Sequence, residues 1–143
     1  MKDIEKAKEF LEKGNYTFVA VKDGTIIAAS QENGIKPLMK ILRKNKSLLK
    51  GSSVADKIIG KAAALLALYA KIKELHGYTM SKSAIEVLSD KDLPFTYDHE
   101  TKYILNNTGD DMCPMEKATI NINKPSKAFT ALEETIKELM SKK

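Results

Sequence analysis

Cys113 is the only cysteine in the chain, and Pro114 and Glu116 follow it closely. A thiolate can attack a substrate as a nucleophile or carry sulfur, and a nearby carboxylate can accept the proton. The same residues also fit a helix N-terminus. Proline suits the first helical position, which puts Cys113 at the N-cap and places Glu116 where it can reach back to the N-cap N–H group. The residues alone leave both interpretations open.

A second group of candidate residues combines small polar and charged side chains. We expect Ser52 and Ser53 to begin a long helix, whose unpaired N–H groups favour an anion. Lys57 and Lys61 would lie one turn apart on that helix and supply positive charge. Asp56 would accept hydrogen bonds from a base, a sugar or a lysine. In the alternative interpretation a serine caps the helix, Asp56 complements its dipole and both lysines are solvated.

Gly60-Lys61 does not form a P-loop. Ala62 stands where that motif has serine or threonine, and Ala55 stands where it has its first glycine. The pair is also expected inside the helix and not before it. Phosphate binding by this motif is therefore not predicted.

The chain lacks the ligands of a closed zinc site, which needs three or four of them. Besides Cys113 it offers only His76 and His99. No serine lies in a Gly-x-Ser-x-Gly turn, so a Ser-His-Asp triad is not indicated either. We expect no metal and no cofactor.

The charge balance argues against a nucleic-acid polymer as the partner. The net charge is +5, from 24 basic and 19 acidic residues, but Arg43 is the only arginine. Lysine does not form the bidentate contacts by which arginine recognises phosphate and guanine. Tryptophan is absent, and the few aromatic residues do not alternate with basic ones as a base-stacking surface would require.

The length of 143 residues fits one domain, spanning residues 1–143, with one sizeable core. No apolar stretch reaches the roughly 18 residues that span a bilayer, and the N-terminus lacks the apolar segment of a signal peptide. One cysteine cannot form an internal disulfide, so a reducing cytoplasm is expected. The oligomeric state is open, and a homodimer fits a domain of this size.

The N-terminal part of the chain shows a helix, a hairpin and a second helix. Apolar spacing predicts a helix over 3–13, and Asp23-Gly24 predicts a tight turn between strands at 16–21 and 25–30. Pro37 lies in the first turn of a helix expected over 36–44. The dominant element is a helix over 53–74, whose alanine-rich middle is apolar on every face and is therefore expected to be buried.

The C-terminal part alternates short strands and helices. The expected elements are a strand at 76–80, a helix at 81–88, a strand at 94–98 and helices at 113–119 and 126–140; residues 103–105 are a candidate small strand. This order favours an α/β fold in which a mixed sheet lies between two layers of helices.

Two segments resemble a known family. Residues 51–64, which read GSSVADKIIGKAAA, and 112–116, which read MCPME, are similar to a small prokaryotic family called domain of unknown function 1893. The resemblance covers nearly the whole chain. It implies a cytidine-deaminase-like fold of three α/β/α layers with a mixed sheet, and it implies no settled activity.

The implied fold can be compared with zinc deaminases. Those enzymes carry His-x-Glu or Cys-x-Glu at the helix after the hairpin and Pro-Cys-x-x-Cys at the next helix. The first place corresponds to residues 54–61, which contain no histidine or cysteine, and the second to residues 79–83, which contain no thiol. The Cys113 segment comes one strand too late and has its Cys and Pro reversed. A metal-free member of the fold is therefore expected.

Three functional hypotheses remain. The leading one is a domain that binds a phosphate-bearing or nucleotide-like small ligand at the N-terminus of the long helix. In the alternative, the protein is an enzyme that uses Cys113 as a nucleophile or sulfur carrier with Glu116 or Asp56 as proton acceptor. The third is an interaction module without a small-molecule site.

Overall fold

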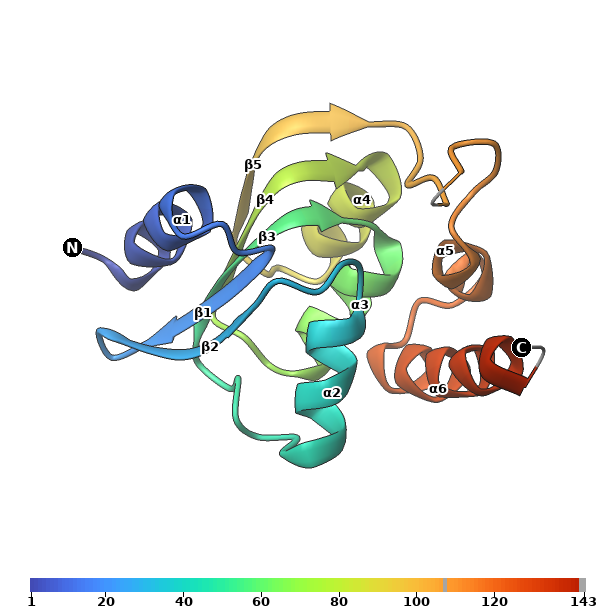
Figure 1. Cartoon of the computed structure of the whole chain (residues 1–143), viewed down its shortest axis with the longest axis horizontal. Helices are drawn as coiled ribbons and strands as arrows, with labels where there is room; N and C mark the ends of the chain where they lie inside the picture. Colours follow the sequence, from blue (N-terminus) through green and yellow to red (C-terminus); the bar gives the residue numbers. More distant parts are fainter. Residues whose placement is uncertain (107, 142–143) are drawn as a thin grey trace.

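The computed structural model describes residues 1–106 and 108–141, in which helices and strands alternate along most of the chain (Figure 1). The elements are α1 (Asp3–Lys13), β1 (Phe18–Lys22), β2 (Thr25–Ser30), α2 (Lys36–Lys44), β3 (Ser53–Ile59), α3 (Lys61–Tyr69), β4 (Glu74–Ser81), α4 (Lys82–Asp90), β5 (Phe95–Thr101), α5 (Pro114–Thr119) and α6 (Pro125–Ser141).

The five strands form one mixed sheet in the order β2-β1-β3-β4-β5. β1 pairs antiparallel with both β2 and β3, whereas β3, β4 and β5 run parallel. The predicted α/β class with a mixed sheet is confirmed; the comparison with deaminases stays a prediction. Because the three parallel strands share a direction, their carboxyl ends meet at one edge of the sheet, where ligands of open α/β folds commonly bind.

The two faces of the sheet are covered unequally. α1 packs on one face, where a small core joins Ala7 and Leu11 to Val19, Val21 and Ala55. The larger core lies on the other face with α2, α3 and α4, and α6 packs against α3 from outside (Figure 1). Residues 53–56 of the central strand β3 are therefore buried on both faces, whereas Lys57 and Ile58 are exposed.

The prediction of one long helix over 53–74 is wrong in its first and last parts. Residues 53–59 form the central strand β3, and the helix begins only at Lys61. Residues 53–56 are buried on both faces of the sheet, so they lack the alternation that reveals a half-exposed strand. The β-branched Val54 and Ile58 and the interruption at Gly60 are the features that favour a strand here.

The middle of the predicted long helix is buried as expected. All residues from Ala62 to Ala67 are buried in α3. The small alanine side chains let β3 and the neighbouring helices pack close to the backbone of α3. The buried helix therefore gives its N-terminus, at Gly60 and Lys61, a fixed position at the carboxyl edge of the sheet.

The predicted hairpin is confirmed. Asp23 and Gly24 both have positive φ, 50° and 77°, as a tight turn between twisted strands requires. The two carboxylate oxygens of Asp3 accept hydrogen bonds from the backbone N–H groups of these turn residues, at 3.0 and 2.9 Å. The first turn of α1 is thereby attached to the hairpin.

The other predicted elements are present with shifted ends. α4, β5, α5 and α6 match the helices and strand expected in that part of the chain, and Ser81 caps α4 by accepting from the backbone N–H of Ala84. The candidate strand at 103–105 is reduced to one bridge between Leu105 and Met112. Every helix in the described part of the chain falls short of a bilayer span in length or in apolar character.

Candidate functional site

The carboxyl ends of the parallel strands border a cavity of about 350 Å³, which we call the α5 cavity. β3 leads through Gly60 into α3, and β4 leads into α4, so two helices begin at this edge. The loop after β5 and helix α5 close the other side. The cavity is lined by Lys61, Lys82, Ser83, Glu86, Lys102, Tyr103, Ile104, Met112, Glu116 and Ile120.

The N-terminus of α3 is occupied by a carboxylate of the chain itself. Oε1 of Glu116 accepts a hydrogen bond from the backbone N–H of Lys61 at 2.8 Å, and Oε2 accepts one from Ala62 at 2.9 Å. The first N–H groups of a helix have no partner within the helix, and the helix dipole favours an anion at this position. Glu116 therefore caps α3 from a distant part of the sequence.

This contact corrects the capping box predicted for α5. Glu116 does not reach back to the N–H group of Cys113, which instead donates to the carbonyl of Ile104 at 2.9 Å. The helix N-terminus that was expected to bind an anion begins at Lys61, and the carboxylate of Glu116 occupies it. An external anion at this edge must be bound by other groups.

Opposing effects act on the acidity of Glu116, whose side chain is buried. Burial raises the pKa of Glu116 above its ordinary value. The N–H groups of Ala62 and Lys61 and the positive charge of Lys61 act in the opposite direction and favour the carboxylate.

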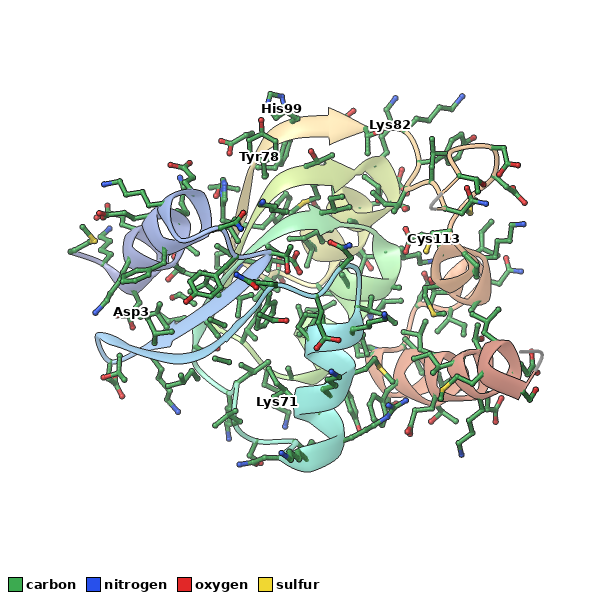
Figure 2. The ribbon with its side chains drawn as sticks, in the orientation of Figure 1. Asp3, Lys71, Tyr78, Lys82, His99 and Cys113 are labelled. Atoms are coloured by element: carbon green, nitrogen blue, oxygen red, sulfur yellow. The ribbon has the colours of Figure 1, made fainter. Side chains whose placement is uncertain are left out.

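Three lysines from separate elements line the α5 cavity. Lys61 begins α3, Lys82 begins α4 and Lys102 follows β5. Figure 2 shows Lys82 near the arrowheads of β4 and β5, far from Lys71 at the opposite end of the parallel strands. Among the described residues, no carboxylate lies within ion-pair distance of these three ammonium groups. Their positive charge is available to an anionic ligand.

The rest of the α5 cavity lining is largely apolar. Ile104 and Met112 come from the loop between β5 and α5, and Ile120 follows α5. The ring of Tyr103 is half-exposed beside them, and the ammonium of Lys102 lies 5.4 Å from the ring centroid. The cavity thus combines cationic groups with aromatic and aliphatic ones.

Of the residues predicted to bind a ligand, only Lys61 lines this cavity. Ser52 and Ser53 are buried at the opposite end of β3, where their hydroxyl groups bond to the Leu49 carbonyl and the Glu74 carboxylate. The helix that was expected to place Lys57 one turn from Lys61 does not exist, because Lys57 is an exposed residue of β3. A ligand-binding role for the two serines and Lys57 stays a prediction.

Asp56 is buried within β3, away from the α5 cavity. Burial raises its pKa to about 8, against the hydrogen bonds from the backbone N–H groups of Ile58 and Lys57. Its neighbours across the sheet are Phe18 on β1 and Gly77 on β4. At neutral pH the side chain is therefore mostly protonated.

Cys113 is the N-cap residue of α5, as predicted, and is half-buried (Figure 2). Its thiol makes no capping hydrogen bond, and its backbone carbonyl accepts from Glu116 and Lys117. Met112 and Glu116 line the α5 cavity, but Cys113 does not. A catalytic role for Cys113 stays a prediction.

The comparisons with known proteins identify the family. A family model described as a domain of unknown function (DUF1893) matches residues 6–136. The chain belongs to this family. The structure is similar to that of a DUF1893 family protein (TM1506) from Thermotoga maritima, with 29% sequence identity, a TM-score of 0.85, and coverage of 94% of this chain and 90% of that chain. No curated protein matches the sequence.

In the observed fold, the two segments to compare with the zinc-binding motifs of deaminases differ from those assumed from the sequence. The helix after the hairpin is α2, and the next helix that follows a strand is α3. The residues to compare are therefore those around Lys36 and those around Lys61, in place of 54–61 and 79–83. Neither place contains histidine or cysteine, and the described residues contain no group of three metal-ligating side chains.

Sequence reasoning missed most of the lining of the α5 cavity. Lys82 and Ser83 follow the predicted strand at 76–80, and Lys102 and Tyr103 follow the strand at 94–98. Polar residues directly after parallel strands are the signal that could have found them, since such strands end at one edge of a sheet. Because residues 53–59 were assigned to a helix, the sequence did not show that they end at the same edge of the sheet.

Proposed function

We propose that this DUF1893 protein binds a phosphate-bearing, nucleotide-like small ligand in the α5 cavity. The observation that carries the proposal is the approach of Lys61, Lys82 and Lys102 from three separate elements to one cavity. Long flexible lysines carry a positive charge that an anion can neutralise, and phosphate is a common partner of lysine in binding sites.

The second part of the ligand follows from the apolar residues of the lining. Tyr103 offers an aromatic face, and Ile104 and Met112 offer apolar surface in the same cavity. A planar base can stack on an aromatic ring while its phosphate contacts the lysines. The volume of about 350 Å³ is at the small end of the range of ligand pockets, roughly 300–1,000 Å³.

The anion is held by side chains and not by the start of α3. Glu116 uses the N–H groups of Lys61 and Ala62, so a phosphate contacts the lysine ammonium groups and the hydroxyl group of Ser83. Glu116 also limits where the phosphate can lie, because its carboxylate repels a phosphate placed next to it. The phosphate therefore lies toward Lys82 and Lys102, and Glu86, which also lines the cavity, limits its approach from the α4 side.

A thermal-shift screen against nucleotides and sugar phosphates tests this proposal. We expect a rise in Tm with at least one nucleotide, because a ligand that binds only the folded state stabilises it. The double variant Lys82→Ala/Lys102→Ala should lose most of that rise. Lys73→Ala removes an exposed lysine beside the start of β4, at the other edge of the sheet, and should keep it. The proposal is wrong if no phosphate compound stabilises the protein, or if the double variant is stabilised equally.

A further inference from the structure

A second cavity adjoins the α5 cavity. It has a volume of about 340 Å³ and is lined by Lys61, Ser83, Glu86, Val87, Asp90, Lys91 and Asn123. We call it the α4 groove, because five of these residues lie on α4 or directly after it. The two cavities share three lining residues, Lys61, Ser83 and Glu86.

The Lys61 side chain lies at the boundary between the two cavities. It extends from the first position of α3 to the carbonyl oxygen of Ile120, to which its Nζ donates at 3.0 Å. Ile120 lines only the α5 cavity, and Asn123 lines only the α4 groove. A neutral carbonyl is a weaker partner for an ammonium than a phosphate is, so an anionic ligand at this boundary competes for Lys61.

The two cavities differ in chemistry. The α5 cavity has the aromatic and apolar lining residues, whereas the part of the α4 groove beyond Lys61 carries Asp90, Lys91 and Asn123 around a single apolar residue, Val87. Beyond Lys61, the two negative charges of Glu86 and Asp90 outnumber the one positive charge of Lys91, which disfavours a further phosphate there. Carboxylates and an amide accept hydrogen bonds well from hydroxyl groups, and an amide also donates them.

From this arrangement, and resting on the proposed function, we infer that the ligand is a nucleoside diphosphate whose terminal phosphate carries a neutral, hydroxyl-rich group such as a sugar. The base lies in the α5 cavity against Tyr103. The diphosphate crosses the boundary at Lys61, and the hydroxyl-rich group lies in the α4 groove with Asp90 and Asn123. Together the two cavities give this ligand the room that neither provides alone.

The inference predicts different affinities for compounds that carry the same base. A nucleoside monophosphate fills only the α5 cavity, and a triphosphate brings its last phosphate to the carboxylates of Glu86 and Asp90. A diphosphate sugar places neutral hydroxyl groups there instead. The expected order of affinity is diphosphate sugar first and then diphosphate, with the monophosphate and the triphosphate weaker than both.

Isothermal titration calorimetry of the full chain tests this order with UMP, UDP, UTP and UDP-glucose, and with the matching adenosine series, since the base is not identified. In one series we expect the diphosphate sugar to bind at least tenfold more tightly than the monophosphate. Asp90→Ala and Asn123→Ala change exposed residues and should remove that gain without weakening the monophosphate. Lys73→Ala is the matched control and should alter neither affinity.

The outcomes distinguish failure of this inference from failure of the proposed function on which it rests. Equal affinities for the monophosphate and the diphosphate sugar, a triphosphate that binds most tightly, or a gain that survives both variants overturns the inference and leaves the proposed function standing. Absence of binding by all eight compounds overturns the inference. If the wider screen of phosphate compounds is also negative, the proposed function is overturned as well.

Discussion

A Cβ atom placed on Gly60 would lie 2.2 Å from Oε1 of Glu116. The backbone of Gly60 is extended, with φ −98° and ψ −174°, so its conformation does not require glycine. What requires glycine is the approach of the Glu116 carboxylate to the start of α3. Gly60, which joins β3 to α3, and Glu116 on α5 are therefore fitted to each other.

Gly60→Ala should lower the free energy of unfolding by about 1–3 kcal/mol, the usual cost of hydrogen bonds to a buried charged group. The added methyl group displaces Glu116 and leaves the N–H groups of Lys61 and Ala62 without their partner. Urea unfolding followed by circular dichroism measures this change. An unchanged midpoint would show that the carboxylate can move at no cost.

A double-mutant cycle separates this contact from other effects of alanine. Glu116→Ala should itself destabilise the protein, by about 1–3 kcal/mol. In that background, Gly60→Ala should cost much less, because no carboxylate is left to displace. Glu134→Gln, at an exposed position on α6, is the neutral control. Strictly additive costs would contradict the assigned contact.

This contact also shows the limits of sequence-based prediction. The helix at 3–13, the hairpin and the buried alanine-rich segment follow from local patterns, namely apolar spacing and turn residues. β3 does not, because its residues 53–56 are buried on both faces and lack alternation. The link from Glu116 to Lys61 spans 55 positions, and no local pattern contains it.

The candidate site was predictable only in part for the same reason. Lys61 and Glu116 were identified by their residue types, although the roles expected of them differ from the contacts observed. Lys82, Lys102 and Tyr103 join them only because parallel strands end at one edge. The common edge can be predicted only if β3 is recognised as a strand. Its assignment to a helix therefore left most of the cavity lining unpredicted.

Asp56 should make stability depend on pH. Its pKa is raised from 3.8 to about 8 in the folded protein, so between these values the folded state holds a proton that the unfolded state releases. Stability therefore falls as pH rises from about 4 to about 8, by at most about 1.4 kcal/mol per pH unit, and levels off above that.

Asp56→Asn removes this titration and keeps an acceptor for the N–H group of Ile58, which lies 3.4 Å from Oδ1 of Asp56. Relative to the unmodified protein, the variant should gain stability steadily from pH 4 to pH 8. Thermal unfolding across this range measures the difference, with Glu134→Gln as the control. A difference that is flat with pH would show that Asp56 titrates normally.

His76 should oppose that trend at acidic pH. Burial lowers its pKa, while the hydrogen bond with Asp98 raises it. The ring lies between Thr96 Oγ1, at 2.6 Å from Nδ1, and Asp98 Oδ2, at 3.2 Å from Nε2. A depressed pKa favours folding above the unfolded value of about 6.5, and this stability is lost as pH falls through the folded value.

Asp98→Asn removes the neighbour that raises the pKa of His76, so that pKa should fall further. An NMR titration of the His76 ring protons measures it directly, and unfolding below pH 6.5 should show a steeper loss of stability. Glu100→Gln, two residues along β5, is the control for a general loss of negative charge. An unchanged or raised pKa in Asp98→Asn would contradict the assigned hydrogen bond.

Cys113 and Met112 offer a test of the alternative in which the thiol takes part in chemistry. Met112 lines the α5 cavity and Cys113 does not, while the cap that Cys113 provides to α5 uses backbone atoms alone. Cys113→Ser should therefore leave the ligand-induced rise in Tm unchanged, and Met112→Ala should reduce it. If Cys113→Ser abolishes the effect of a ligand while Met112→Ala does not, the thiol contacts the ligand. The binding site would then extend to Cys113, as the enzyme hypothesis built on that residue requires.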